Sequence, residues 1–421
     1  MLTCLRYGYL HRWRYCSATE QSERLTAMSK FVAAIAAFAL CTAVLTVTAP
    51  ASAGTVTLKS MKFSAAKPVP HFHYEGEVIE GDLGRITAAV RQYADCDRVA
   101  LSETGDNCAV FTMTSEGGNY VEGLDMAHYF RANAIATWVE TGSYCYSACA
   151  FAFLGGSGHS SQSSVGDYID RTIEPGATLG FHAPYFAGDS LDELVAQFGI
   201  EEVLGGTREN IALMIEQLVL WNIDKSILAR ITNMGADDAY IAATAQDLYF
   251  LRTALPPAPR RFWSPDPAEA LRNACMRLLA HHEGVSPDTT RVRLGGEMIY
   301  NIGVDETGRG LTGYRLIDKP SGLAISYCAM PTSDTLLDAD GDIALYYGAG
   351  VSGKMRPAVT FFHRADGWST LGTGGVASQR ILQKGAISHF FLSPDAKLDS
   401  ALALTWRLVR DDVLKTGRHE Q

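Results

Sequence analysis

Two hydrophobic periodicities alternate along residues 70–255. Short apolar runs typical of strands are followed by segments in which apolar positions recur as they do in amphipathic helices. The runs predict strands over residues 71–79, 109–114, 136–140 and 177–182. The other segments predict helices over residues 83–93 and 121–133, directly after Ser147, and through most of residues 191–251. Strands alternating with helices predict a layered α/β unit with parallel strands, preceded by a polar, extended lead-in over residues 54–70.

The pattern changes at a proline-rich segment, residues 255–261, which we interpret as a domain boundary because proline discourages both helices and central strands. Beyond it, a helical segment over residues 267–281 precedes apolar runs interrupted at hairpin-like intervals by glycine, aspartate and asparagine. The runs are 291–294, 298–304, 313–317, 323–330, 343–347, 358–363, 387–392 and 401–408. The sequence therefore predicts an α/β domain over residues 54–255 and a smaller, mainly antiparallel β domain over residues 262–421.

The first 53 residues carry the features of an export signal. Met28-Ser29-Lys30 is a short positive segment, an uncharged apolar run follows it, and Ala51-Ser52-Ala53 matches a cleavage motif. We expect residues 1–27 to be an over-extended start, with Met28 as the true first residue. The prediction is an exported, periplasmic protein that begins at Gly54 after cleavage. The alternative is an uncleaved membrane anchor, because the apolar run approaches the length that spans a bilayer.

Composition narrows the function classes. The chain has 421 residues, of which 47% are hydrophobic and 19% are charged, and its formal net charge is −10. This length suits two domains, and this composition excludes disorder as the main state. No long run of lysine and arginine occurs, so we expect no nucleic-acid partner.

The cysteines predict disulfides. Of the nine in the chain, three precede Gly54, and the even set that follows favours disulfides in an exported protein. The sequence alone leaves every pairing open, but proximity favours Cys96 with Cys108, Cys145 with Cys149, and Cys275 with Cys328. The second pair would clamp the turn that carries Ser147; the alternative is two small buried thiols. No spacing of cysteine and histidine suits zinc, so we predict neither a metal nor a cofactor.

Three separated segments carry candidate chemistry. Residues 114–118 (Thr-Ser-Glu-Gly-Gly) end a predicted strand in paired glycines, which leave N–H groups free to point at a carbonyl oxygen. Ser147 lies where a strand gives way to a helix, at the positive end of the helix dipole. His182 lies in the segment 180–184 (Gly-Phe-His-Ala-Pro) and has the ring chemistry of a general base.

In this order the three segments resemble the Clp peptidase and crotonase superfamily, specifically its exported branch of Clp-like proteins with a cysteine-flanked serine. The resemblance covers about residues 70–255 and implies the layered fold of that superfamily. It implies Ser147 as nucleophile and His182 as general base. It also implies an oxyanion hole formed by the amides of Gly117, Gly118 and Ala148.

The third member of the implied triad is an aspartate that precedes a short aromatic, aliphatic and small stretch. Asp238, followed by Ala-Tyr-Ile-Ala, matches this shape best, while Asp237 and Asp224 stay open as alternatives. Such a carboxylate would hold the imidazole in one tautomer and stabilise the imidazolium. The chain departs from the family pattern at Glu116, where a proline is usual, and at Tyr146, where a small residue is usual.

Each candidate also has a structural interpretation. Ser147 could only cap a helix, and His182 could be a core histidine. The Gly/Ser-rich residues 155–176 are expected to form an inserted loop, in which His159 is a competing base. His71 and His73 alternate along a predicted strand, but no third metal ligand is evident.

We expect an exported serine hydrolase, a peptidase whose substrates are peptides or flexible protein segments. Cytosolic Clp peptidases work as double rings fed by an ATP-driven unfoldase; an exported protein has no ATP supply, so no unfoldase partner is expected and any homo-oligomer should be smaller. One alternative is a non-catalytic Clp-like scaffold that binds partners through residues 262–421. Another is a crotonase-type acyl-CoA enzyme, which the export signal disfavours because the cofactor is cytosolic.

Overall fold

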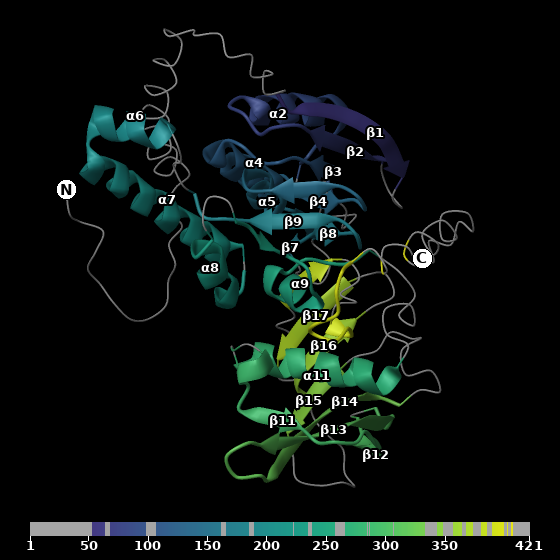
Figure 1. Cartoon of the computed structure of the whole chain (residues 1–421). Coiled ribbons are helices and arrows are strands. Elements are labelled where there is room, and N and C mark those ends of the chain that lie inside the picture. Colours follow the sequence, from purple (N-terminus) through teal and green to yellow (C-terminus); the bar gives the residue numbers. More distant parts are fainter. Residues whose placement is uncertain are drawn as a thin grey trace, which may run out of the picture. The chain divides into compact units, whose positions relative to one another are not determined.

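The structure is a computed structural model of the whole chain (Figure 1). It describes residues 53–63, 68–97, 107–160, 166–184, 189–221, 223–234, 238–256, 266–283, 285, 287–305, 307–332, 343–347, 357–363, 368–373, 380–384, 390–399, 402 and 406. The predicted signal segment lies outside these residues, except for its last residue, Ala53. None of the helices in the described ranges has the length and apolar character needed to cross a membrane.

The first half of the described chain contains a mixed sheet with helices between its strands, which confirms the prediction of an α/β unit. Its strands run in the order β1-β2-β3-β4-β8. They are β1 Thr55–Phe63, β2 Pro68–Glu75, β3 Ala109–Thr114, β4 Ile135–Val139 and β8 Arg171–Ile173. All neighbours from β2 to β8 are parallel. The prediction of an extended segment over residues 54–70 is confirmed for β1, but this segment is more than a lead-in, because β1 pairs antiparallel with β2 as an edge strand.

Helices α2 Asp82–Tyr93, α4 Tyr120–Ala132 and α5 Ala148–Phe153 follow strands of this unit, as predicted. In Figure 1, α4 and α5 lie next to each other beside β3 and β4. Their close approach depends on Gly123 of α4, where a Cβ atom would lie 2.4 Å from the carbonyl oxygen of Ala148. A side chain at position 123 would therefore push away the helix that begins after Ser147.

A second, three-stranded sheet has the order β10-β9-β5. Strand β5, Tyr144–Tyr146, is parallel to β9, Thr178–Phe181, and β10, Tyr240–Ile241, is antiparallel to β9. The expected inserted loop over residues 155–176 is largely a hairpin of β6, Ser157–Ser160, and β7, Gly166–Ile169, followed by β8. The hairpin starts at Gly156, which is packed so tightly that a Cβ atom would lie 2.2 Å from the Thr137 hydroxyl.

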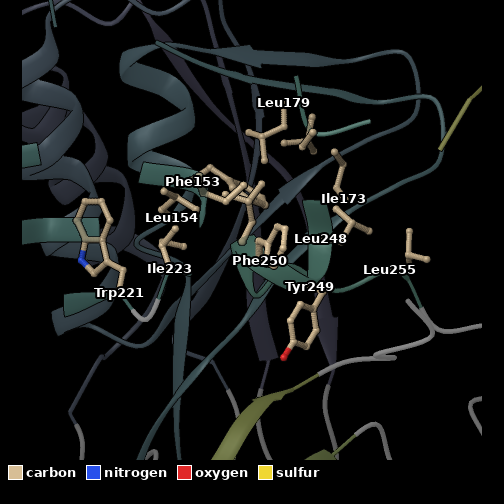
Figure 2. Packing of buried hydrophobic residues seen from close by; sticks show 14 of the residues in the cluster. Phe153, Leu154, Ile173, Leu179, Trp221, Ile223, Leu248, Tyr249, Phe250 and Leu255 are labelled. Atoms are coloured by element: carbon tan, nitrogen blue, oxygen red, sulfur yellow. The ribbon is translucent and has the colours of Figure 1, made fainter. Parts of the chain in front are cut away.

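The segment after β9 is mostly helical, as predicted. Its helices are α6 Asp189–Phe198, α7 Ile200–Leu220, α8 Lys225–Thr232 and α9 Ala245–Leu251. Figure 2 shows Trp221 and Ile223, which follow α7, near Phe153 and Leu154 at the end of α5. The same buried cluster includes Leu248 and Phe250 of α9, so the helical segment belongs to the core of the α/β unit.

A buried arginine holds the ends of three helices. The guanidinium of Arg171 is 0% exposed and donates to the carbonyl oxygens of Leu154, Trp221 and Arg252. These are the C-cap residues of α5, α7 and α9. The C-terminal end of a helix carries partial negative charge, so three such ends offset part of the cost of burying a cation. Burial also lowers the pKa of Arg171.

The last part of the described chain is helix α11, Pro267–Glu283, with a sheet whose neighbours are all antiparallel, as predicted. The strand order is β11-β13-β14-β15-β16-β17-β18, with β12 paired to β13. The strands are β11 Val292–Leu294, β12 Ile299–Val304, β13 Gly310–Asp318, β14 Ala324–Pro331, β15 Ile343–Tyr347, β16 Pro357–His363, β17 Trp368–Thr373 and β18 Arg380–Lys384.

Two predicted strands of this part are wrong where they are described. Within residues 387–392, the carbonyl oxygens of Phe390 and Leu392 accept from Arg277 of α11 and that of Phe391 accepts from Asn273, so these residues form no strand. Within residues 401–408, the two described residues, 402 and 406, are helical. The domain boundary near residue 256 stays a prediction; main-chain hydrogen bonds connect residues 394–398 to Ala243, Ala245 and Gln246.

All three disulfides follow the pairing that proximity favoured. They join Cys96 to Cys108, Cys145 to Cys149, and Cys275 to Cys328. Such a set is compatible with an exported protein, since disulfides persist in oxidising compartments.

Candidate functional site

Ser147 occupies a sharp turn between β5 and α5. Its φ and ψ angles are 53° and −122°. Residues other than glycine rarely adopt this backbone conformation, which is strained and is found at functional sites. Its N–H donates to the carbonyl oxygen of Gly180 at 2.9 Å, and its own carbonyl accepts from Phe151 at 3.1 Å. The side chain makes no capping hydrogen bond and is partly exposed, so a helix-cap role does not account for this serine.

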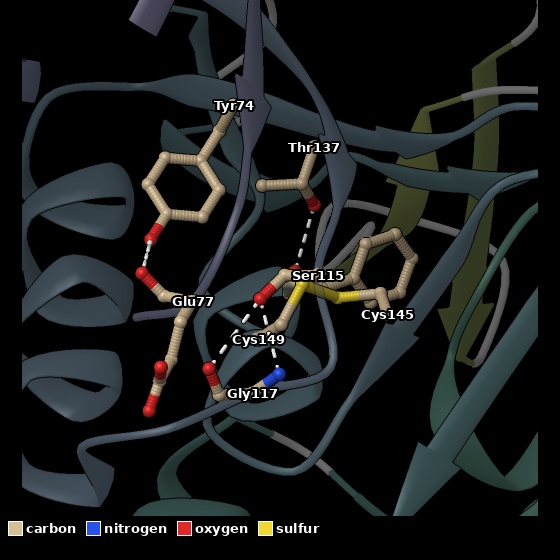
Figure 3. Close-up of a disulfide and its surroundings, with 8 residues drawn as sticks. Tyr74, Glu77, Ser115, Gly117, Thr137, Cys145 and Cys149 are labelled. Carbon is tan, nitrogen blue, oxygen red and sulfur yellow. Dashed lines mark hydrogen bonds between the residues drawn. A yellow bond between two sulfur atoms is a disulfide. The ribbon is translucent and has the colours of Figure 1, made fainter. Parts of the chain in front are cut away.

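The disulfide between Cys145 and Cys149 spans this turn (Figure 3). Cys145 lies in β5 and Cys149 in α5, both fully buried, with their Cα atoms 5.3 Å apart. The bond therefore joins the strand before Ser147 to the helix after it. This arrangement restricts the main chain on both sides of the strained residue.

The glycine turn lies directly against Ser147. A Cβ atom on Gly117 would lie 2.6 Å from the Cβ atom of Ser147, and the φ angles of Gly117 and Gly118 are 104° and 134°. Both features require glycine at position 117. The turn and the nucleophile candidate are thus in van der Waals contact, as the prediction of an oxyanion hole requires.

The hydrogen bonds of the turn distinguish its two amides. Gly117 donates its N–H to the buried Ser115 hydroxyl at 3.0 Å (Figure 3). Val78 and Gly118 form a parallel β-bridge. In it, Val78 donates its N–H to the Gly117 carbonyl and Asn119 donates to the Val78 carbonyl, each at 2.7 Å. The Gly118 N–H takes no part in this bridge. Ala148 is the first residue of α5, where an N–H group has no partner inside the helix. Gly118 and Ala148 therefore stay candidate donors to an oxyanion, whereas the Gly117 N–H already has an acceptor.

His182 follows the central strand of the three-stranded sheet. The parallel register aligns Tyr146 of β5 with Gly180 of β9, so Ser147 and His182 both leave their strands at the same edge. Neighbouring strands are about 4.8 Å apart, and the Ser147 N–H bonds to the Gly180 carbonyl, so the main chain at Ser147 lies beside the end of β9 that leads to His182. The His182 Nδ1 atom lies 3.0 Å from the carbonyl oxygen of Ala183.

Asp238 precedes β10, which neighbours β9 on the side away from β5. The antiparallel register pairs Tyr240 with Phe181 and Ile241 with Gly180, so Asp238 lies before the paired residues of β10. The Asp238 side chain is exposed.

The alternatives to Asp238 differ in what the structure says of them. Asp224 is the N-cap of α8 and accepts from the N–H and the hydroxyl of Ser226 at 2.8 Å and 2.6 Å. Its carboxylate is thus engaged in helix capping. Asp237 lies outside the described residues.

A cleft of about 540 Å³ adjoins the glycine turn. Its lining includes Ser115, Gly117 and Gly118, the ends of β2 and β3, and residues of β1 and β5. Three carboxylates, those of Glu75, Glu77 and Glu116, are part of this lining. The cleft has room for a short peptide segment beside Gly118. Among the described residues, its lining includes neither Ala148 nor Ser147 nor His182.

The remaining histidine candidates have structural partners. His159 pairs through Nδ1 with Asp167 at 2.7 Å across the β6–β7 hairpin. His73 lies in β2, where its Nδ1 atom is 2.8 Å from the Thr112 hydroxyl and burial lowers its pKa. Across the described ranges, no group of three His, Cys, Asp or Glu side chains could hold a metal ion.

Two polar side chains of α4, Asp125 and Tyr120, have raised pKa values and were not among the residues predicted from the sequence. Burial, with Glu122 nearby, raises the pKa of Asp125 to about 6. Burial also raises the pKa of Tyr120, whose hydroxyl has no hydrogen-bond partner among the described residues and whose ring meets Phe151 of α5 edge-on at 5.3 Å. The burial of Asp125 could have been predicted from the sequence, because this acid stands between the apolar residues Leu124 and Met126.

Comparisons with known proteins leave the family open. The chain matches no protein-family model and no curated protein. The resemblance to the Clp and crotonase superfamily therefore stays a prediction from the three sequence segments.

Proposed function

We propose that this protein is an exported serine hydrolase of Clp-like type that cleaves peptides or flexible protein segments. One observation carries the proposal. Ser147 lies in a strained turn at the end of β5, with the glycine turn against it and His182 at the end of the neighbouring strand. Strain at an uncapped, partly exposed serine is typical of a nucleophile held at a strand-to-helix turn.

The chemistry follows from the roles of these groups. His182 accepts the hydroxyl proton of Ser147 while the oxygen attacks the scissile carbonyl carbon. The N–H groups of Gly118 and Ala148 stabilise the tetrahedral oxyanion, a contribution of about 3–4 kcal/mol per donor. The imidazolium then returns the proton to the leaving amine or alcohol, and water attacks the acyl-enzyme by the same route.

The substrate class follows from the cleft and the location. The cleft borders the glycine turn, and an extended or flexible peptide segment is the substrate that we expect to lie there with its scissile bond at Ser147. An exported protein has no ATP supply for an unfoldase, so folded proteins are not expected substrates. The disulfides of the described residues support export, because such bonds persist in oxidising compartments.

The test is covalent labelling of the oxidised, exported protein by a fluorophosphonate. The wild type should be labelled, and Ser147→Ala and His182→Ala should each abolish labelling. Ser143→Ala is the matched control, because the recorded hydrogen bonds of Ser143 involve only its main chain. This control should be labelled like the wild type.

Two results would overturn the proposal. Labelling that persists in Ser147→Ala would place the reactive serine elsewhere. A folded, oxidised wild type that is not labelled would favour the non-catalytic scaffold, in which residues 262–421 bind a partner.

A further inference from the structure

A main-chain carbonyl oxygen contacts the imidazole of His182. Its Nδ1 atom lies 3.0 Å from the carbonyl oxygen of the next residue, Ala183. A carbonyl oxygen can only accept a hydrogen bond, so Nδ1 carries the ring proton and donates it. In the neutral ring the lone pair is then on Nε2, which is the nitrogen that can take a proton from a nucleophile.

The direction of this carbonyl is restricted from both sides. Ala183 is 7% exposed and belongs to the same buried cluster as Phe181, the last residue of β9. Pro184 follows it, and a residue before proline is confined to extended conformations. Strand β9 is itself paired on both sides, with β5 and with β10. The acceptor of the Nδ1 proton is therefore a rigid part of the main chain.

The carboxylate of Asp238 is less suited to this task. Its side chain is exposed, and solvent and salt screen the charge of an exposed carboxylate. A carboxylate is needed to select the tautomer only where nothing else does so. Here the Ala183 carbonyl already selects it.

We infer that Ala183 is the positioning residue of the site: its main-chain carbonyl, rather than the carboxylate of Asp238, orients His182 and selects its tautomer. The catalytic meaning of this inference rests on the proposed function. In a Ser-His-Asp site, an amide in place of the carboxylate favours the wrong tautomer and lowers turnover about 10⁴-fold. At this site the same replacement leaves the tautomer unchanged.

The first test compares Asp238→Asn with the wild type in fluorophosphonate labelling of the oxidised protein. Glu202→Gln, which removes one exposed carboxylate from α7, is the matched control. We expect the labelling rate of Asp238→Asn to stay within about tenfold of both. A loss beyond about 100-fold, approaching that of a carboxylate-dependent triad, would overturn the inference.

The second test reads the tautomer directly. Nitrogen-15 chemical shifts of the His182 ring, assigned against His182→Gln and recorded at alkaline pH with a neutral ring, distinguish a proton on Nδ1 from one on Nε2. We expect the Nδ1–H form in the wild type and in Asp238→Asn. A proton on Nε2 in either protein would overturn the inference.

The third test loosens the acceptor. Pro184→Ala releases Ala183 from its restriction, so the ring should populate both tautomers while the protein stays folded. An unchanged Nδ1–H signal would show that the restricted carbonyl is not what selects the tautomer. The tautomer signals do not require activity, so an unlabelled wild type would contradict the proposed function while these spectra still decided the positioning role.

Discussion

Replacing Arg171 by methionine tests how much the buried guanidinium contributes to stability. The change keeps a long apolar side chain but removes the donors to the carbonyl oxygens of Leu154, Trp221 and Arg252. A buried acceptor without a partner costs about 1–3 kcal/mol, so the gross loss is about 3–9 kcal/mol. Removing a buried charge returns several kcal/mol of desolvation free energy. We therefore expect the free energy of unfolding to fall by about 3–4 kcal/mol.

Urea denaturation of the oxidised protein, followed by circular dichroism, measures this difference. Arg208→Met is the matched control, because Arg208 is exposed on α7, one of the three helices that Arg171 holds. This control should change the free energy of unfolding by less than about 0.5 kcal/mol. A loss below about 1 kcal/mol for Arg171→Met would refute the reasoning, since it would show that desolvation cancels the hydrogen bonds.

Three further predictions concern the site and its helix. Gly117→Ala should reduce fluorophosphonate labelling more than 100-fold, because the new methyl group would meet the Ser147 Cβ atom at 2.6 Å; normal labelling would contradict the contact. Replacing Cys145 and Cys149 together by alanine should lower the free energy of unfolding by about 2 kcal/mol in urea and slow labelling about tenfold; equal labelling would show that the turn needs no clamp. The pKa of Asp125 is raised to about 6, so wild-type stability should fall as pH rises from about 4 to 6; Asp125→Asn, measured in urea at both ends, should remove this slope and add about 1 kcal/mol at pH 7, a value discounted for partial exposure.

The sequence predicts the elements of the α/β unit where local pattern is strong. Strand β3 and helices α2 and α4 agree with prediction within about one residue, because periodicity and glycine boundaries are local signals. The very short strands β5 and β10 were not predicted, since only their pairing with β9 makes them strands. The run at residues 387–392 failed for the same kind of reason, because hydrogen bonds from α11 capture its carbonyl oxygens.

The candidate site also combines residues that local sequence signals predict with features that depend on tertiary structure. His182 and the paired glycines could be proposed from sequence because each stands at the end of a recognisable apolar run, and Ser147 because it precedes a small, apolar helical segment. The tautomer of His182 could not be predicted, because it depends on the direction of one carbonyl oxygen, that of Ala183. The role of Arg171 was equally hidden, since its acceptors lie at distant positions that only the folded chain brings together.

The bond between Cys145 and Cys149 links the geometry of the site to the compartment. If the chain is exported as proposed, it passes first through a reducing environment, where these two thiols would stay unpaired and the turn around Ser147 would lack its clamp. The clamp would form only after the chain reached oxidising surroundings. The proposed hydrolase would then be kept from acting on nascent chains in the cytosol.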